Sequence, residues 1–387
     1  MSVLVLNAGS STLKFSLFAG QSAKRVAEGT VEDPPKDAVT AILGSIREPL
    51  LSDPVAVVGH RVVHGGKIFT ESVAIDARVT QEIARLSELA PLHNPPALAA
   101  IEAAQRALPG VPHVAVFDTA FFADLPPDRH VYPLPYEWYA DHGIRRYGFH
   151  GISHAYCAER AAEFLNRPSV GFRAVTCHLG NGCSATATLG GKAVATTMGF
   201  TPLEGLMMGS RAGSVDPGIL LHAMDRMGLS PEKLGEILQK RSGLEGLSGV
   251  SSDFRAVREA AKEGNERARL ALAIYAHSVR AAIGSLAVAL GGVDALVFTA
   301  GVGENASSLR EEVCRGLECL GLRLDPERNR TVRPDADLAG SGSTGRILIL
   351  HTREDLPIAR EALRVTGAGG DSPPARGNGH PQNGLGE

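Results

Sequence analysis

Short apolar runs that end in small or polar residues recur along the chain and predict buried strands. Residues 3–6 precede Asn-Ala-Gly-Ser-Ser, and residues 13–18 resume with alternation, so a strand, a turn and a second strand are expected. A second unit of this kind spans residues 174–179, the corner Gly-Asn-Gly-Cys-Ser, and residues 185–189 and 193–197. Two further runs, residues 295–300 before Gly-Val-Gly-Glu-Asn and residues 346–351, also read as strands. Because α/β sheets bind ligands beyond strand carboxyl ends, these corners are candidate binding elements.

Apolar positions at near-helical spacing lie between these runs. They predict helices over residues 79–89, 96–108, 154–165, 231–241, 265–290 and 356–365. Strands that alternate with helices of this length indicate an α/β protein. The most apolar stretch, residues 281–300, contains Gly291, Gly292 and Asp294, so a helix end, a stop and a strand are expected rather than a membrane span. Residues 367–387, rich in glycine and proline, are expected to form a disordered tail.

Glycine is the unusual feature of the composition. The chain has 44 glycines among 387 residues, above the usual share of about 7%, and they show no collagen periodicity. Aromatic residues make up only 5%, so the excess is expected in turns and where backbone approaches a ligand closely. The 39 basic and 42 acidic side chains give a net charge of −3 with no basic block, and we therefore expect no nucleic-acid or membrane partner.

Cysteine usage and the N-terminus indicate a reducing compartment. The five cysteines are odd in number and include no Cys-x-x-Cys pair, which argues against a disulfide framework and a cysteine zinc site. Cys177 and Cys183 flank a glycine corner without an assignable histidine and acid, and they are expected to be small buried residues. The first residues lack a basic region and a long apolar run, so they do not resemble a secretory signal, and a cytoplasmic location is expected.

Three charged residues stand in apolar or small-residue surroundings. They are Arg61 in VVGHRVVHGG, Asp118 in VAVFDTAFF and Arg211 in MMGSRAGS. A charge inside such a run usually has a partner or a ligand, and for each residue alone a structural ion pair is the simpler explanation. Two arginines in one chain also suit a phosphoryl group, whose transition state spreads negative charge over three oxygens.

Histidine occurs in two pairs at a spacing of four residues. His60 with His64, and His150 with His154, have the spacing of two ligands on one helix face, but neither pair has the glutamate of His-Glu-x-x-His. We expect His60, His64 and His154 to be satisfied structural residues, and a histidine that donates to phosphate is the better functional alternative. The role of His93, on a rigid proline-flanked turn, stays open.

Taken in order, eight segments resemble the acetate kinase family: VLVLNAGSSTLKFSLF, GHRVVHGG, APLHNPP, VFDTAFF, YGFHGISH, CHLGNGCS, TTMGFTPLEGLMMGSRAGSVDPG and FTAGVGEN. The resemblance extends to about Val365. It implies an α/β, two-domain actin-like ATPase (ribonuclease H-like) fold, with a duplicated mixed β-sheet core, flanking helices and nucleotide in the interdomain cleft. The implied domains are residues 1–121 with 355–366, and residues 122–354 for nucleotide binding and dimerisation, followed by the tail.

The resemblance also implies the reaction. It is the reversible transfer of the γ-phosphoryl group of ATP to acetate, which gives acetyl phosphate and ADP, with Mg²⁺, or Mn²⁺ in its place, in a homodimer. Cys183 stands where the family has serine.

The matching motifs assign roles to residues of this chain. The catalytic positions are Asp118, His150 and Arg211, and the magnesium positions are Asn7 and Glu354. The acetate-binding positions are Arg61, Val63, Leu92, His93, Phe149 and Pro202. The ATP-binding positions are Lys14, His178, Leu179, Gly180, Asn181, Gly182, Asp253, Phe254, Arg255, Gly301, Val302, Gly303, Glu304 and Asn305.

The chemistry fits these assignments. Acetate is ionised at neutral pH, so no strong base is needed, and Asp118 is expected to orient the metal and the substrate. In-line positioning and charge neutralisation then carry catalysis. A propionate or butyrate kinase stays open, because one methylene in an apolar pocket is worth only about 1–3 kcal/mol, although Val63 favours acetate. An actin-like or Hsp70-like ATPase without a metabolic substrate, and a zinc hydrolase, are more remote alternatives.

Overall fold

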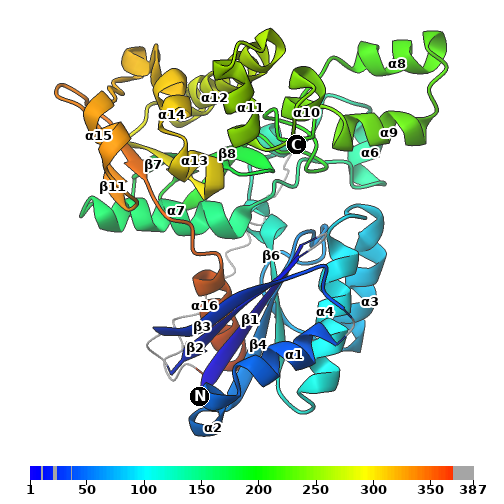
Figure 1. The fold of residues 1–387 in the computed structure, drawn as a ribbon. Coiled ribbons are helices and arrows are strands. Elements are labelled where there is room, and N and C mark those ends of the chain that lie inside the picture. Colours follow the sequence, from blue (N-terminus) through cyan, green and yellow to red (C-terminus); the bar gives the residue numbers. More distant parts are fainter. Residues whose placement is uncertain (10–11, 21–23, 36, 369–387) are drawn as a thin grey trace, which may run out of the picture.

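Two six-stranded mixed sheets organise the computed structural model, which describes residues 1–9, 12–20, 24–35 and 37–368 (Figure 1). The first sheet has the order β3-β2-β1-β4-β6-β5 and the second β11-β12-β10-β7-β8-β9. The strands of the first lobe are β1 Ser2–Ala8, β2 Thr12–Ala19, β3 Lys24–Glu32, β4 Val55–Val62, β5 Val73–Ala74 and β6 His113–Phe117. Those of the second lobe are β7 Arg173–Leu179, β8 Cys183–Leu189, β9 Lys192–Thr196, β10 Ala295–Thr299, β11 Ala336–Asp337 and β12 Arg346–Ile349.

The two sheets have the same topology. In each, the first three strands form an antiparallel meander. The first strand also pairs in parallel with a later strand, and that strand pairs in parallel with the next one. A two-residue antiparallel strand completes each edge, β5 beside β6 and β11 beside β12. This repetition confirms the predicted duplicated mixed-sheet core. It also makes the first turn of each meander, and the ends of the parallel strands, equivalent positions in the two lobes.

Alternation along β1 explains how helices cover both faces of the first sheet. Val3 and Val5 pack with α16, whereas Leu4 and Leu6 pack with α1 and α4 on the other face. Successive strand side chains point to opposite faces, so a strand buried on both sides is apolar throughout. The helices of this lobe are α1 Ala38–Ser45, α2 Arg47–Ser52, α3 Ala77–Arg85, η1 Leu86–Glu88, α4 Asn94–Ala107, η2 Asp118–Phe122 and α16 Asp355–Thr366.

The second sheet is also enclosed between helices. Ala295 and Val297 of β10 pack on the side of α7, and Leu296 and Phe298 on the side of α12. The helices after η2 and before α16 are α5 Pro127–His130, α6 Tyr136–Ala140, α7 Gly151–Phe164, α8 Pro217–Arg226, α9 Pro231–Lys240, α10 Gly243–Ser248, α11 Phe254–Lys262, α12 Glu266–Leu290, α13 Ala300–Asn305, α14 Ser307–Cys314, η3 Leu317–Leu320 and α15 Pro326–Thr331.

The last helix returns to the first lobe. After β12, α16 packs against β4, β1 and β6, so the first strands and the last described helix together build the lower lobe in Figure 1. This arrangement agrees with the two-domain expectation, while the boundaries at 121/122 and 354/355 stay predictions. The helix ends at Gly367, which has a φ of 67°. Of the predicted tail, residues 369–387 lie outside the described residues, as do Ser10 and Ser11 of the first turn.

The apolar stretch at residues 281–300 is divided as predicted. Helix α12 ends at Leu290, Gly291 takes a left-handed conformation with a φ of 67°, and β10 begins at Ala295. By length and composition alone α12 could cross a membrane. Its buried face packs against β8, α10 and α11, which is the arrangement of a core helix.

Several predicted boundaries were wrong. The strand expected over residues 295–300 ends at Thr299, because Ala300 has a φ of 65° and begins α13, so the Gly-Val-Gly-Glu-Asn corner is helical. The strand expected over residues 346–351 ends at Ile349. Helix α7 begins at Gly151, three residues before the expected start at residue 154. Glycine is required at this start, because a Cβ there would lie 2.0 Å from the carbonyl oxygen of Asp118.

Candidate active site

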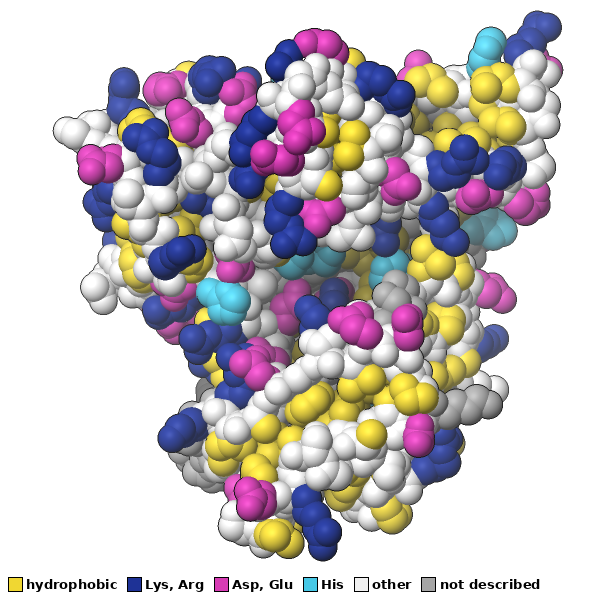
Figure 2. Space-filling model, in the orientation of Figure 1, with side chains coloured by type: hydrophobic (Ala, Val, Ile, Leu, Met, Phe, Trp, Pro, Cys, Tyr) yellow, Lys and Arg dark blue, Asp and Glu magenta, His cyan; other side chains and the backbone are white. Residues whose placement is uncertain are grey.

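The carboxyl ends of the parallel strands of both sheets lie at a hollow between the two lobes. Figure 2 shows histidine, acidic and basic side chains gathered in it. From the first lobe come Arg61 on β4 and Asp118 directly after β6. From the second come the corner between β7 and β8 and the segment that enters α16, which carries Glu354. The strand ends therefore bring together charges that are far apart in the sequence.

Arg61 is the centre of a four-residue polar group. Its Nη2 lies 2.6 Å from Asp118 Oδ2, and its Nε donates to both oxygens of that carboxylate at 3.2 Å. Its Nη1 donates to Asn7 Oδ1 at 3.3 Å and lies 3.6 Å from Glu354 Oε2. Asn7 Nδ2 in turn donates to Glu354 Oε2 at 3.3 Å. The predicted metal residues and the predicted carboxylate-binding arginine thus form one cluster.

The charged residues of this cluster shift one another's pKa values. Burial acts to lower the pKa of Arg61, but the charges of Asp118 and Glu354 outweigh it and raise that pKa above its ordinary value. Burial raises the pKa of the Asp118 carboxyl, against the opposing effect of Arg61. Burial also acts to raise the pKa of Glu354, but the charges of Arg61 and His178 hold it below its ordinary value. Glu354 is therefore ionised at neutral pH.

Arg211 reaches the same hollow from the second lobe. Its Nη2 donates to His93 Nε2 at 3.3 Å, and its Nη1 donates to the carbonyl of Pro202 at 3.3 Å. Burial, with the charges of Arg211 and Arg61, lowers the pKa of His93 to about 4, so His93 is a neutral acceptor at neutral pH. Burial also lowers the pKa of Arg211. Neither contact neutralises the guanidinium charge.

His150 stands between these groups and the glycine corner of the second sheet. It precedes α7 with a left-handed φ of 56°, uncommon for a residue other than glycine. Its ring stacks on His178 with centroids 4.3 Å apart. Burial, and then the neighbouring His178, Arg61, His154 and Arg211, lower the pKa of His150 well below its ordinary value. The imidazole is therefore neutral in the free protein at pH 7.

The two glycine corners leave space beside the backbone. A Cβ at Gly180, Gly182 or Gly303 would meet nothing closer than 3.4 Å, and one at Gly301 would meet nothing within 4 Å. Gly209 differs, because its Cβ would lie 2.2 Å from Asn181 Oδ1, so this glycine serves backbone packing against the first corner. Among the described residues, Gly301 faces open space, whereas a Cβ at the other three positions would make ordinary van der Waals contact, so a ligand against this backbone stays a prediction.

Several predicted nucleotide residues have local structural partners. Asp253 caps α11 by accepting from the backbone N–H of Arg255, and it pairs with that side chain at 2.7 Å. Phe254 is buried beside Tyr275. Glu304 accepts from the backbone N–H of Ala300 at 2.9 Å and from that of Thr352 at 3.2 Å. Asn305 Nδ2 donates to the carbonyl of Gly301. These side chains shape the corners, and any contact of theirs with nucleotide stays a prediction.

The remaining predicted residues lie around the same hollow. Val63 and Phe149 share a core cluster between the lobes, and Leu92 adjoins His93. Lys14 is paired with Asn7 in the β1–β2 ladder. Of the predicted methyl-pocket residues, Pro202 accepts from Arg211 through its carbonyl and Val63 follows Arg61 by two residues, while the corners contain His178, Leu179, Asn181 and Val302.

The three histidines expected to be structural differ in how far their ring nitrogens are hydrogen-bonded to the described residues. His60 Nε2 lies 2.9 Å from His113 Nδ1, and both nitrogens of the buried His154 have hydroxyl partners. His64 is only partly satisfied, since its Nδ1 accepts from Gly66 N–H but its buried Nε2 has no hydrogen-bond partner. The expectation that His64 is satisfied was therefore incomplete.

Sequence reasoning missed the buried groups that support the site. Ser153 Oγ lies 2.8 Å from His178 Nδ1 and 2.9 Å from Thr352 Oγ1, and Ser184 Oγ lies 2.8 Å from His150 Nδ1. Arg310, only 2% exposed, donates to the carbonyls of Gly303 and Glu304 at 2.8 Å and so holds the second corner. The available signal was a hydroxyl or charge inside an apolar run, as in Gly-Asn-Gly-Cys-Ser.

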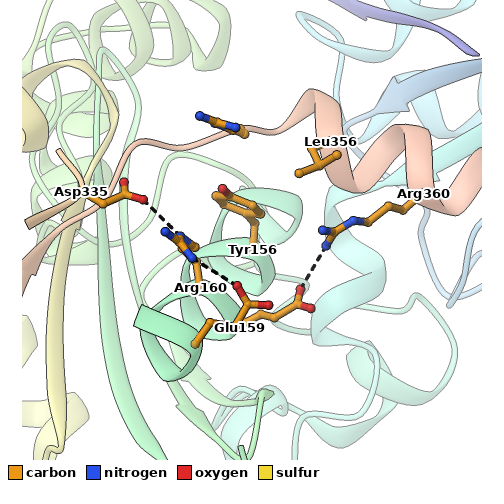
Figure 3. Close-up of a pocket in the computed structure, with 8 residues that line it drawn as sticks. Tyr156, Glu159, Arg160, Asp335, Leu356 and Arg360 are labelled. Atoms are coloured by element: carbon orange, nitrogen blue, oxygen red, sulfur yellow. Dashed lines mark hydrogen bonds and ion pairs between the residues drawn. The ribbon is translucent and has the colours of Figure 1, made fainter. Parts of the chain in front are cut away.

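A second hollow lies away from the predicted site residues, between α7 and α16 (Figure 3). Its lining residues are Tyr156, Glu159, Arg160, Glu163, Asp335, Arg353, Leu356 and Arg360. Arg160 pairs with Asp335 at 3.1 Å, and Arg360 of α16 pairs with Glu159 of α7 at 3.7 Å. Since α7 packs on the second sheet and α16 on the first, the Arg360–Glu159 pair connects the two lobes.

The cysteines agree with the sequence expectation on their environment. All five are free, and Cys157, Cys177, Cys183 and Cys314 are buried, while Cys319 is exposed. Burial raises the pKa of Cys183 to about 11, so the thiol is protonated at neutral pH.

The duplicated two-lobed fold, with cations and open glycine corners facing a central hollow, is that of a two-domain ATP-dependent phosphotransferase of the actin-like class. The chain matches the family model of the Acetokinase family over residues 22–360. It is 55% identical over 333 residues to the acetate kinase of Gloeobacter violaceus, which covers 85% of this chain and 82% of that protein. It is 45% identical over 395 residues to the acetate kinase of Desulfitobacterium hafniense, with 94% and 99% covered.

Solved structures of acetate and propionate kinases are also similar to this chain. The acetate kinase of Porphyromonas gingivalis superposes with a TM-score of 0.88 at 39% identity, with 94% of this chain and 99% of that chain covered. A propionate kinase from Francisella tularensis gives 0.86 at 36% identity, with 93% and 98% covered. The chain belongs to the acetokinase family and is a phosphotransferase whose acceptor is a carboxyl group.

Proposed function

We propose that the protein is a magnesium-dependent acetate kinase, which transfers the γ-phosphoryl group of ATP reversibly to acetate. A carboxylate oxygen forms the new bond to phosphorus, the bond to the bridging oxygen breaks, and its electron pair leaves with ADP. The observation that carries the proposal is that His150 and Arg211 of the second lobe border Gly182, while the charge of Arg61 from the first lobe acts on the His150 ring. Cations preorganised in this way stabilise a transferring phosphoryl group.

The residues of the cleft divide the work. Arg61, held by Asp118, faces the acceptor carboxylate, and Val63 with Phe149 provides the apolar wall for its methyl group. Arg211 supplies positive charge that no nearby carboxylate neutralises in the described part of the chain. The backbone at Gly180 and Gly301 gives room for nucleotide. No general base is required, because acetate is already an anion.

The cluster at the cleft suits a magnesium ion. In the described residues no group of three or more His, Cys, Asp or Glu side chains could enclose a metal. Mg²⁺ is usually held by only one or two carboxylates together with phosphate and water oxygens. Asn7 Oδ1 and the ionised Glu354 are the groups that would hold it, and Mn²⁺ accepts the same oxygen ligands. When bound, the ion supplies charge neutralisation at the phosphates.

A homodimer built through the second lobe is part of the proposal. Figure 2 shows apolar side chains where Figure 1 places α8 and α9. Ile219, Leu221 and Met227 are 57%, 65% and 65% exposed, which is unusual for three large apolar residues on and after one helix. Light scattering should give twice the chain mass of 40.6 kDa, and Ile219→Asp with Leu221→Asp should give the monomer. A native monomer would contradict the dimer.

The free, mostly buried thiols support a reducing cytoplasm.

Trapping of acyl phosphate with hydroxylamine tests the proposed reaction. The native protein is incubated with ATP and Mg²⁺, and with acetate, propionate or butyrate in parallel. We expect acyl hydroxamate with acetate at the highest kcat/KM. A preference for propionate or butyrate would reassign the substrate within the same chemistry, and no product with any of the three acids would contradict the kinase.

A further inference from the structure

A row of hydrogen bonds leads from His150 into the second lobe. Ser184 Oγ lies 2.8 Å from His150 Nδ1 and 2.7 Å from His154 Nε2. His154 Nδ1 lies 2.7 Å from Thr176 Oγ1, which lies 3.4 Å from the carbonyl oxygen of Thr186. Ser184, His154 and Thr176 are fully buried. The β7–β8 ladder, which pairs Thr176 with Thr186, and the four-residue spacing of the two histidines on α7 create the row.

The carbonyl at the inner end favours one direction of hydrogen bonding along the row. A carbonyl oxygen only accepts, so the Thr176 hydroxyl donates to it and accepts from His154 Nδ1–H. Burial lowers the pKa of His154 well below its ordinary value, so its ring is neutral and its Nε2 accepts from the Ser184 hydroxyl. Ser184 has no second hydrogen, and therefore its oxygen accepts from His150 Nδ1–H. Neutral His150 is left with a bare Nε2.

The bare nitrogen faces the proposed phosphate corner. A Cβ at Gly182 would lie 3.4 Å from His150 Nε2 and 4.0 Å from Arg211 Nη1, so both side chains border the same space. The titratable and charged groups around the His150 ring are His178, His154, Arg61, Arg211 and, through a backbone hydrogen bond, Asp118. Most of these disfavour a positive charge on the ring. A negatively charged phosphoryl group beside Nε2 would favour that charge.

We propose that Ser184 and His154 are positioning residues for phosphoryl transfer, because they fix His150 as the Nδ1–H tautomer. When a phosphoryl group enters the Gly182 corner, Nε2 takes one proton from solvent and donates it in a hydrogen bond to a phosphoryl oxygen. Nδ1–H keeps its acceptor throughout, so the imidazolium has partners on both sides. This inference rests on the proposed function, since it requires a phosphoryl group at that corner.

Ser184→Ala removes the acceptor of Nδ1–H and tests the proposal. A hydrogen bond to a charged group is worth about 1.5–3 kcal/mol, so kcat should fall about 10- to 100-fold while KM for ATP and acetate changes little. The protonated ring loses stability, so the alkaline limb of kcat against pH should move to lower pH. Ser184→Thr, which restores a hydroxyl, should recover both. Thr188→Val is the control, because Thr188 is equally buried on β8 but its hydroxyl donates to the carbonyl of Ala174.

Proton uptake gives a readout that a merely structural role would not move. It is measured by calorimetry of the complex with ADP, Mg²⁺, acetate and fluoroaluminate, in buffers of different ionisation enthalpy. Wild type and Thr188→Val should take up the same fraction of a proton at pH 7, and Ser184→Ala less. A second variant, Thr176→Val, removes the hydroxyl that accepts from His154 Nδ1–H, so the hydrogen bonds of the row can reverse direction. His150 Nε2 then already carries a hydrogen in the neutral ring, and proton uptake on binding should again fall.

The outcomes separate the two proposals. Suppose that the wild type is active, and that Ser184→Ala and Thr176→Val have the same proton uptake and the same pH profile as the wild type. This result would overturn the role of the row and leave the proposed kinase function intact. The same changes in Thr188→Val would also overturn it, because they would show a general effect of losing a buried hydroxyl. A wild type that forms no acyl phosphate would instead overturn the proposed function.

Discussion

The guanidinium of Arg61 binds the carboxylate of Asp118 where two parallel strands end side by side. β4 and β6 are neighbours in register, with Val62 opposite Phe117, and this register brings the Arg61 and Asp118 groups to within 2.6 Å. The side chain of Asp118 is 1% exposed and that of Arg61 17%, so the pair is largely withdrawn from water. The two residues act as one unit, in which Asp118 binds Nε and Nη2 of Arg61 and leaves Nη1 to contact Asn7 and Glu354.

Substitution of only one member of the Arg61–Asp118 pair should lower the free energy of unfolding. Arg61→Gln leaves the buried Asp118 carboxylate without its partner, and loss of one member of a buried pair typically costs about 3–5 kcal/mol in the free energy of unfolding. Urea denaturation at pH 7 measures this loss. The double variant Arg61→Gln with Asp118→Asn should recover most of the stability but no activity. Additive losses in the double variant would show that the pair is not a unit.

Arg211→Ala should affect catalysis far more than stability. Among the described residues, the Arg211 guanidinium donates hydrogen bonds only to His93 and the Pro202 carbonyl, so its removal leaves none of their buried carboxylates unpaired. Loss of a guanidinium that stabilises a transferring phosphoryl group costs about 10³-fold or more in kcat. Steady-state kinetics and thermal unfolding are measured together, with Arg226→Ala at an exposed position as the control. Near-normal turnover in Arg211→Ala would remove this residue from the mechanism.

Val63→Ala should change the choice of acid. Val63 is buried and packs in the same cluster as Phe149, so its truncation opens space at the proposed methyl wall. The ratio of kcat/KM for propionate to that for acetate should rise about tenfold, since one methylene is worth about 1–3 kcal/mol. Val73→Ala, in the far edge strand of the same sheet, should leave the ratio unchanged. An unchanged ratio in Val63→Ala would place the substrate elsewhere.

Stability should fall in acid because of buried neutral histidines. Burial, and then the neighbouring His113, lower the pKa of His60 well below its ordinary value of about 6.5. The unfolded chain therefore binds more protons below that pH, so the stabilisation is complete above about pH 6.5 and is lost as pH falls toward the folded-state pKa. Each such histidine contributes a slope of up to about 1.4 kcal/mol per pH unit.

Urea denaturation at pH values between 7 and 5 measures this slope. His60→Gln, which cannot titrate, should give a shallower slope than wild type, whatever its stability at pH 7. An identical slope in His60→Gln would mean that the buried pair of histidines is not linked to acid unfolding.

Strands that are apolar on both faces could be predicted from the sequence, and others could not. β1, β7 and β10 are enclosed between helix layers, so their apolar runs were clear signals. β3 is an edge strand with mostly exposed and half-buried positions, and only Ala27 and Val31 pack on the core. Its signal was a weak alternation. The helical corner after β10 depends on Ala300 at positive φ and on Glu304, which accepts from its N–H, a contact no propensity reveals.

The charged members of the site were accessible to sequence reasoning for a physical reason. Arg61, Asp118 and Arg211 stand in apolar surroundings, where a charge needs a partner, and the fold shows that the first two are partners of each other. The ion-pair interpretation of Arg61 is therefore confirmed, while its role in binding a ligand stays a prediction. Ser184 and Thr176 were not accessible, because their pairing with the histidines depends on the β7–β8 register and on α7 beginning at Gly151.

The most direct test of the account follows the phosphoryl group itself. Native protein is mixed with ATP labelled in the γ-phosphoryl group, Mg²⁺ and acetate, and the label is assayed in hydroxylamine-sensitive acetyl phosphate and on the protein. Direct transfer in the cleft predicts label in acetyl phosphate, none on the protein, and loss of product in Arg211→Ala. Absence of labelled acyl phosphate, or a labelled protein formed without acetate that then passes its label to acetate, would contradict the account.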